Sequence, residues 1–166
     1  MIFGVSTGTI NDALAASMEI DSPLVSQRIE SLHWLQDNKY RTFGMICPSL
    51  PQANPAAYDK FSKDVCRKIR VSKCEHVWAE PMNIRGKSVK KTIDALNTAG
   101  FTTEADALTA VSGPGKKSAW EDYAQATFNA HKINIPSAKL RFLHYPSKAA
   151  HAWWIGEVAN GAIVLN

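Results

Sequence analysis

The segment from Val77 to Arg85 reads Val-Trp-Ala-Glu-Pro-Met-Asn-Ile-Arg, an apolar run that ends abruptly in polar side chains. Three other apolar runs end in the same way, and the polar groups that follow them are Ser6-Thr7-Gly8-Thr9, Cys47-Pro48-Ser49 and His144-Tyr145-Pro146. In folds that alternate strands with helices, ligands bind at the carboxyl ends of parallel strands, where loops present polar groups above an apolar platform. The four runs therefore predict a shared site at the strand ends.

Stretches with helical apolar spacing separate these runs. Short strands are predicted at 2–5, 42–47, 76–79, 140–143 and 162–165. Helices are predicted on the stripes Val25, Ile29, Leu32 and Leu35, then Tyr58, Phe61, Val65 and Ile69, then Val89, Ile93 and Leu96, and near 103–111, 119–131 and Trp153-Trp154. We expect Asp21 or Ser22 to cap the first of these helices, Ser147 to cap the last, and Gly100 to end the third.

This order of elements predicts an α/β protein. Strands separated by helices favour parallel pairing with right-handed crossovers, either in an open sheet or in part of a β/α barrel. A complete eight-unit barrel needs about 200 to 250 residues. The chain has 166 residues, too few for a complete barrel, and we expect one domain over 1–166.

Composition narrows the class further. With 45% apolar and 20% charged residues the chain can form one substantial core, and no apolar run approaches the ~20 residues that cross a bilayer. The N-terminus lacks the order of a secretory signal, so a cytoplasmic protein without membrane contact is expected. The spacing of Cys47, Cys66 and Cys74 indicates neither a disulfide framework nor a zinc site. A net charge of +4 permits an anionic partner such as nucleic acid.

Five segments, spread over most of the chain, together resemble a known family: Ser6-Thr7, Arg28-Ile29-Glu30-Ser31-Leu32, Phe43-Gly44-Met45-Ile46-Cys47-Pro48, the stretch from Ala79 to Lys87, and Leu140-Arg141-Phe142-Leu143. They resemble the C-terminal part of radical S-adenosylmethionine proteins, in the branch of spore photoproduct lyase that is often labelled DNA repair photolyase-like. The resemblance implies a partial (half) β/α barrel with mostly parallel strands and helices on the outer face.

Members of that family hold a [4Fe-4S] cluster on a CxxxCxxC loop, because soft sulfur ligands suit iron. This sequence contains no such motif, and its three cysteines cannot replace it by their spacing. Two explanations fit: the chain is the C-terminal half of a barrel whose cluster-bearing half is elsewhere or lost, or it is a degenerate relative that keeps a binding surface. Either form would expose strand edges and an apolar inner face, so we expect self-association or a cluster-bearing partner chain.

The resemblance also implies a cofactor site. Ser6 and Thr7 resemble strand-end residues that bind the ribose or amino-acid part of S-adenosylmethionine, and Arg28 resembles a helix arginine that meets its carboxylate. The alternative for Ser6 and Thr7 is an ordinary turn or cap, and the alternative for Arg28 is a solvated side chain.

Four other residues are candidates for substrate binding: Glu80, Asn83, Arg85 and His144. The first three place an acid, an amide and a guanidinium just beyond one strand, although an ion pair between Glu80 and Arg85 that only shapes the loop is an equal alternative. His144 ends another strand and is expected to face the same mouth, whereas backbone groups satisfy most histidines. No catalytic residue and no metal ligand is assigned.

For the other reactive or aromatic side chains, a structural role is the expected one. Cys47 has no neighbour in sequence that lowers the pKa of its thiol, so a small buried hydrophobe is expected there. Trp153 and Trp154 could stack on nucleobases, but adjacent helical residues point about 100° apart, so one of them is expected to pack inward. Trp120, Tyr123, Thr127 and His131 are predicted to form a core stripe.

The expected function is therefore that of a C-terminal part of a radical S-adenosylmethionine enzyme, a lyase or related enzyme. It would act on a nucleic-acid-like or other anionic substrate and be inactive without a cluster-bearing segment. The alternative is a non-catalytic binding or scaffold module with the same fold. Acid and base chemistry by Glu80 is the weakest hypothesis, since no second acid or phosphate loop accompanies it.

Overall fold

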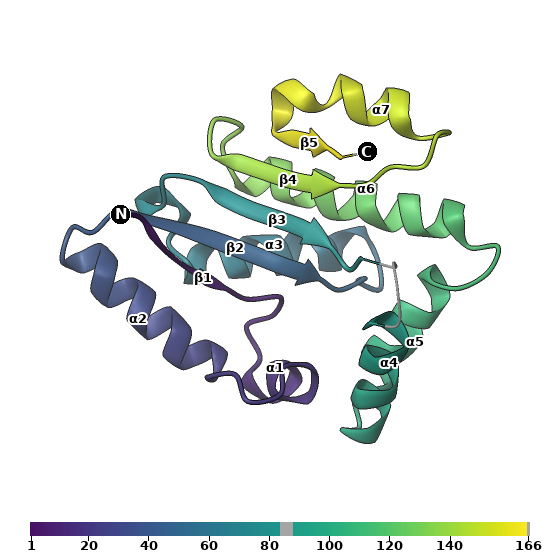
Figure 1. The fold of residues 1–166 in the computed structure, drawn as a ribbon, viewed down its shortest axis with the longest axis horizontal. Helices are drawn as coiled ribbons and strands as arrows, with labels where there is room; N and C mark the ends of the chain where they lie inside the picture. The colour runs from purple at the N-terminus through teal and green to yellow at the C-terminus, as the bar shows by residue number, and fades with distance from the viewer. Residues whose placement is uncertain (84–87, 166) are drawn as a thin grey trace.

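The structure is a computed structural model that describes residues 1–83 and 88–165, and its centre is an open sheet of five parallel strands (Figure 1). The strands are β1 (Phe3–Ser6), β2 (Thr42–Ser49), β3 (Val77–Pro81), β4 (Leu140–His144) and β5 (Ala162–Val164). They lie in the sheet in the order in which they occur in the chain, and every neighbouring pair is parallel. The predicted α/β fold and all five predicted strands are confirmed.

Helices fill the connections between the strands. They are α1 (Asp12–Met18), α2 (Val25–Asp37), α3 (Pro55–Lys68), α4 (Ser88–Thr98), α5 (Thr102–Val111), α6 (Lys117–Asn134) and α7 (His151–Gly156), with short 3-10 turns η1 (Val71–Lys73) and η2 (Val158–Asn160). The sequence did not predict α1. Gly100 has a φ of 84° and ends α4 as predicted, because glycine adopts this left-handed conformation without steric cost.

The start of α2 differs from the prediction. Leu24, and neither Asp21 nor Ser22, is the N-cap residue, and the Gln27 side chain accepts a hydrogen bond from the Leu24 backbone N–H at 3.1 Å. Asp21 has a φ of 59°, so the chain turns there before the helix begins. Ser147 does accept a hydrogen bond from Ala150 N at 3.3 Å, although α7 itself begins four residues after it.

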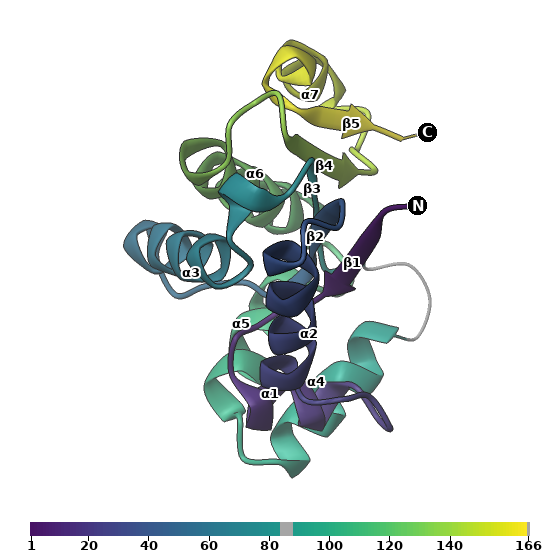
Figure 2. The same ribbon diagram turned by 90° about the vertical axis from the view of Figure 1, so that its left-hand side faces the viewer.

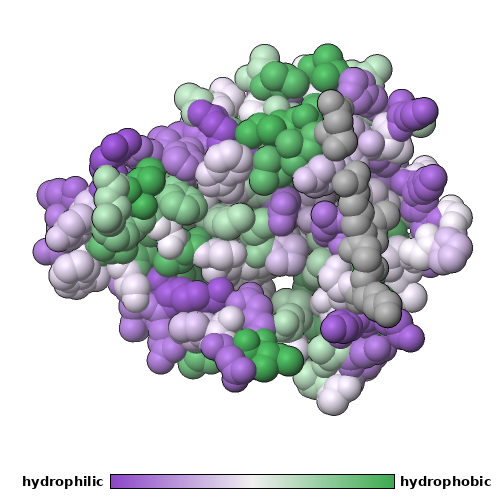
Figure 3. Space-filling view, viewed as in Figure 1, coloured by the Kyte–Doolittle hydropathy of each residue, from purple (hydrophilic) through white to green (hydrophobic). Residues whose placement is uncertain are grey.

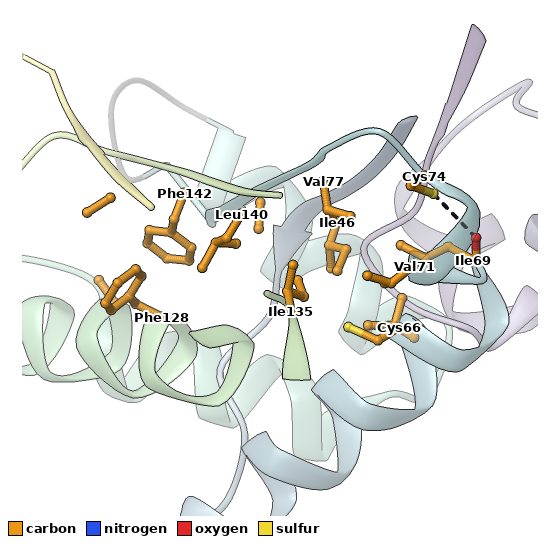
Figure 4. Packing of buried hydrophobic residues seen from close by; sticks show 14 of the residues in the cluster. Ile46, Cys66, Ile69, Val71, Cys74, Val77, Phe128, Ile135, Leu140 and Phe142 are labelled. Atoms are coloured by element: carbon orange, nitrogen blue, oxygen red, sulfur yellow. Dashed lines mark hydrogen bonds between the residues drawn. The ribbon is translucent and has the colours of Figure 1, made fainter. Parts of the chain in front are cut away.

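The main core lies between the sheet and the helices on one of its faces. Figure 2 shows α3 and α6 together on that side of the strands. Side chains of α2, α3, α6 and α7 join inward-facing strand residues in one buried cluster, and Figure 4 shows part of it, with Phe128 of α6 beside Phe142 of β4. Because consecutive parallel strands connect with one handedness, the helices gather on one face, as in a sector of a β/α barrel.

A second core sits beside the carboxyl ends of the strands. The long connection from β3 to β4 contains α4 and α5 before it reaches α6. Apolar residues of α1, α4, α5 and α6 pack together there, and they include Leu14, Leu96, Leu108 and Trp120. This insertion explains why the alternation of strand and helix breaks between 102 and 133, as the sequence predicted.

The opposite face of the sheet has no helix over it within the described ranges (Figures 1 and 2). Alternation along the strands places half-buried side chains on this face: Phe43, Met45, Trp78, Arg141, Leu143 and Ile163. Figure 3 shows hydrophobic residues on this side of the molecule between hydrophilic ones. β1 and β5 are the edge strands of the sheet. The inner face of a partial barrel is therefore open, as expected from the sequence.

None of the helices in the described part of the chain has both the length and the apolar character needed to cross a bilayer.

Candidate functional site

A pocket of about 550 Å³ lies at the carboxyl ends of β3 and β4, next to the start of α6. Its wall combines ring faces with a few polar groups. The residues that line it are Glu80, Pro81, Asn83, Lys117, Trp120, Glu121, Leu143, His144, Tyr145, Pro146, Ser147, Lys148 and Ala149. Pockets of this size with a largely apolar wall and convergent polar groups are typical small-molecule sites.

Positive charge lies at the rim of this pocket. Lys117 begins α6 and Lys148 lies in the loop after β4, and both side chains are exposed. Trp120 is buried in the wall, whereas Tyr145 is 39% exposed. Ammonium groups beside aromatic rings favour ligands that carry both a negative charge and a flat ring.

A buried carboxylate forms the floor of the site. Glu121 of α6 is 6% exposed and His144 is 3% exposed. His144 Nε2 donates to Glu121 Oε2 at 3.0 Å, and Trp154 Nε1 of α7 donates to the same oxygen at 3.2 Å. The backbone N–H of Ser147 donates to Glu121 Oε1. One acid therefore connects α6, the end of β4, the following loop and α7.

These contacts determine the protonation states of Glu121 and His144. Burial alone would raise the pKa of Glu121, but the hydrogen bonds from Ser147, His144 and Trp154 outweigh it and lower that pKa below its usual value. Burial lowers the pKa of His144, and the nearby Glu121 carboxylate offsets only part of this effect. At neutral pH the site thus holds an ionised carboxylate and a neutral imidazole.

Glu80 and His144 reach the pocket from different faces of the sheet. Alternation places Glu80 with Trp78 on the open face and His144 with Phe142 on the helix-covered face. Both line the pocket because it lies beyond the last residues of the strands. Asn83 also lines it, whereas Arg85 falls outside the described residues.

Cys47 is buried next to this site, at 8% exposure. Burial raises the pKa of its thiol strongly, and the Glu80 carboxylate raises it further. The thiol is therefore neutral and a poor nucleophile, which agrees with the predicted role as a small buried hydrophobe. The prediction that one of Trp153 and Trp154 packs inward is also confirmed, since Trp154 is fully buried.

The predicted cofactor residues lie away from this pocket, at β1 and α2. Ser6 Oγ donates to Cys47 O at 3.2 Å, and Thr7 Oγ1 donates to the carbonyl of Thr9. Arg28 Nη1 donates to Ser6 O at 2.7 Å, and its Nη2 lies 2.8 Å from Glu19 Oε2. The structure brings the three residues together with one another, but not with Glu80 or His144 in the pocket.

These residues do not fit S-adenosylmethionine as the chain stands. Both hydroxyl protons and the two outer nitrogens of Arg28 are already engaged with the chain itself. Arg28 Nε and Nη2 have no hydrogen-bond partner in the described chain, although Nη2 is ion-paired with Glu19. Both atoms are buried, so they cannot reach a ligand without movement of the surrounding residues. The assignment of Ser6, Thr7 and Arg28 to the cofactor therefore stays a prediction from resemblance.

No group of three or more His, Cys, Asp or Glu side chains in residues 1–83 and 88–165 is arranged to hold a metal ion. Cys47, Cys66 and Cys74 are all free and buried. Burial raises the pKa of each of these thiols above its usual value.

Sequence reasoning missed Glu121, the central acid of the site. One signal could have revealed it: Glu121 shares a helical stripe with Ala124 and Phe128, at spacings of three and four residues. An acid on the apolar face of a helix needs buried donors, because an unpaired charge there is very costly. The identity of those donors, His144 and Trp154, depends on tertiary structure.

A second buried polar network is centred on His131 and Tyr123 of α6. His131 is fully buried, with its Nδ1 2.9 Å from Ser62 Oγ and its Nε2 3.3 Å from Ser49 Oγ. Tyr123 OH donates to the Ser49 carbonyl and accepts a hydrogen bond from Met82 N at 2.7 Å. The network joins α3 and α6 to the carboxyl ends of β2 and β3.

Acidification is expected to destabilise the protein through His131. Burial lowers the pKa of His131 from 6.5 to about 4. The unfolded chain therefore binds more protons between these values, so the contribution of His131 is complete above pH 6.5 and is lost as the pH falls towards 4. It amounts to about 2 kcal/mol between pH 7 and pH 5.

Urea unfolding of the wild type and of His131→Gln at both pH values measures this contribution as a difference, so other titrating groups cancel. An equal loss of stability in the two proteins would contradict the assignment.

Comparison of the chain with known protein families, with curated proteins and with solved structures finds no match.

Proposed function

We propose that this chain is the C-terminal, substrate-binding part of a radical S-adenosylmethionine type of enzyme, and that its nucleic-acid-like or other anionic substrate binds in the pocket at the ends of β3 and β4. Chemistry would require a cluster-bearing segment, which this chain does not supply. The observation that carries the proposal is the pocket: a ring-lined hollow with Lys117 and Lys148 at its rim, at the edge of the sheet where β/α folds bind ligands.

The charges around the pocket support an anionic ligand. Glu80 and Glu121 are the acids that line the pocket, against Lys117 and Lys148. The carboxylate of Glu121 accepts three hydrogen bonds inside the protein, so it does not face a ligand as a free anion, and only Glu80 remains against the two lysines. Lys117 and Lys148 have no carboxylate partner among the ion pairs of the described chain. Two available cations beside Trp120 and Tyr145 suit a phosphate that is attached to a flat base.

The test is calorimetric titration with a mixed-sequence single-stranded DNA trinucleotide. We expect binding that weakens about 5-fold in Lys117→Ala and in Lys148→Ala, because an exposed ion pair contributes up to about 1 kcal/mol. Binding should also weaken with added salt, as counterion release requires. Lys63→Ala is the matched control, because Lys63 is an exposed lysine of α3 outside the pocket.

Two further titrations identify the kind of anion. The corresponding nucleosides without phosphate test whether charge is needed, and inorganic phosphate tests whether the base is needed. The proposed function would be contradicted if the trinucleotide does not bind, or if it binds equally well to the wild type, Lys117→Ala, Lys148→Ala and Lys63→Ala.

The open face of the sheet is consistent with a binding site for the cluster-bearing segment. Trp78 and Leu143 lie half-buried on this face, and β1 and β5 leave both edges of the sheet unpaired within the described chain. In a complete barrel, further strands would close these edges. We propose that the cluster-bearing segment occupies this position.

The alternative proposal is a non-catalytic binding module. It is favoured by the internal hydrogen bonds of Ser6, Thr7 and Arg28, which leave no evident cofactor cradle. Titration with S-adenosylmethionine separates the two: binding that Arg28→Ala abolishes supports the enzyme, whereas trinucleotide binding without cofactor binding supports the module.

A further inference from the structure

His144 has one ring nitrogen that the protein uses and one that it does not. Nε2 donates to Glu121 Oε2 at 3.0 Å. For Nδ1, no hydrogen bond with any residue of the described chain is found, and it is not among the buried polar atoms that lack a partner. His144 lines the pocket although the residue is only 3% exposed. Nδ1 is therefore the ring nitrogen that the protein leaves available, on a residue that forms part of the pocket wall.

Glu121 determines which nitrogen carries the proton. An ionised carboxylate can only accept hydrogen bonds, so Nε2 must be protonated, and Nδ1 keeps its lone pair. Trp154 Nε1 and Ser147 N hold the carboxylate in place from the other side. The Trp154 ring also lies against the imidazole, with 4.3 Å between the centroids. Ring orientation and tautomer are therefore both fixed before a ligand arrives.

We propose that His144 Nδ1 is the hydrogen-bond acceptor for an N–H or O–H group of the ligand, and that Glu121 is the positioning residue that presents it. The inference rests on the proposed function, because it concerns the same pocket. It narrows the ligand to an anion that also carries a donor, such as a nucleotide with a free base amide or sugar hydroxyl. A buried acceptor rejects ligands that lack the matching donor, because it would lose its contact with water and gain nothing.

Two variants of His144 separate recognition from structural support. Glutamine reaches the position of Nε2 and keeps a group that can donate to Glu121, but it leaves nothing at the position of Nδ1. Asparagine does the reverse: it places a polar group near Nδ1 and loses the contact with Glu121. If His144 recognises the ligand through Nδ1, His144→Gln should weaken binding more than His144→Asn. If His144 has only a structural role, His144→Asn should be the more harmful change.

The experiment is calorimetric titration of the same trinucleotide into the full chain, His144→Asn and His144→Gln. We expect His144→Gln to bind about 10-fold more weakly and His144→Asn to bind within about 3-fold of the wild type, since an unmatched polar group costs on the order of 1–3 kcal/mol. Circular dichroism of each variant establishes that it is folded.

The outcomes are distinct. If the wild type does not bind, the proposed function is wrong and this inference falls with it. If the wild type binds and His144→Gln binds equally well, only the inference is overturned. A second measurement avoids dependence on the variants: in ¹⁵N NMR of the wild type, the trinucleotide should shift the Nδ1 resonance of His144 while Nε2 stays protonated. An unchanged Nδ1 resonance in the bound state would overturn the inference.

Discussion

Replacement of Glu121 by alanine is expected to lower the free energy of unfolding by about 3–5 kcal/mol, because removal of a buried charged group leaves its buried hydrogen-bond partners unpaired. The change removes the acceptor of three donors at once: His144 Nε2, Trp154 Nε1 and Ser147 N. Glu121, His144 and Trp154 are all buried residues, so water cannot replace the lost carboxylate without opening the contact between α6, α7 and β4. Urea unfolding at pH 7 measures the effect.

The neighbouring acid provides the control. Asp122 is exposed on the same helix, and its replacement by alanine should change stability by less than about 0.5 kcal/mol. A loss below about 1 kcal/mol for Glu121→Ala would show that the three donors find other partners, and the view of Glu121 as the centre of the site would be wrong.

Replacement of Trp154 by alanine is expected to cost about 3–5 kcal/mol, the range for large aromatic side chains in cores. Trp154 is fully buried, and its ring is stacked on Phe142 with a centroid distance of 5.6 Å and an interplanar angle of 7°. It also meets the edge of Phe128 at 5.4 Å. Alanine would leave a cavity between α6, α7 and β4, and it would remove one donor to Glu121.

Ile155 is the matched control because it follows Trp154 in α7 and is 51% exposed. Ile155→Ala should cost less than about 1 kcal/mol. Trp154→Phe keeps one aromatic ring in the core but removes the N–H donor and part of the indole volume; a cost of about 1–3 kcal/mol, smaller than that of Trp154→Ala, is expected. Equal stabilities of Trp154→Ala and Ile155→Ala would contradict the described packing of α7.

Local pattern was enough to predict the elements of this fold. The stripe Tyr58, Phe61, Val65 and Ile69 was identified as helical because its spacing matches the period of a helix, and α3 spans Pro55–Lys68. The first four strands were visible as apolar runs with a polar stop, and the fifth as a short apolar run near the C-terminus. In contrast, α1 has only seven residues, Asp12–Met18, and is held by Asn11, whose side chain accepts hydrogen bonds from Ala13 N and Leu14 N. So short a helix has no stripe that sequence analysis can detect.

The candidate site was only partly visible in the sequence. The strand-end rule correctly indicated that Glu80, Asn83 and His144 lie near one edge of the sheet, because it depends only on where apolar runs stop. Lys117 and Glu121 come from α6, more than twenty residues before His144, and only the packing of α6 against β4 brings them to the pocket. Likewise, only tertiary structure shows that Arg28 is paired with Glu19.

The most direct test of the proposed pocket is to map trinucleotide binding on the ¹⁵N–¹H NMR spectrum of the chain. We expect backbone resonances to shift at 80–83, at 117–121 and at 143–149, the segments that line the pocket, while those of Ser6, Thr7 and Arg28 stay in place. Shifts confined to other regions, or no shifts at a concentration that saturates the calorimetric signal, would contradict it.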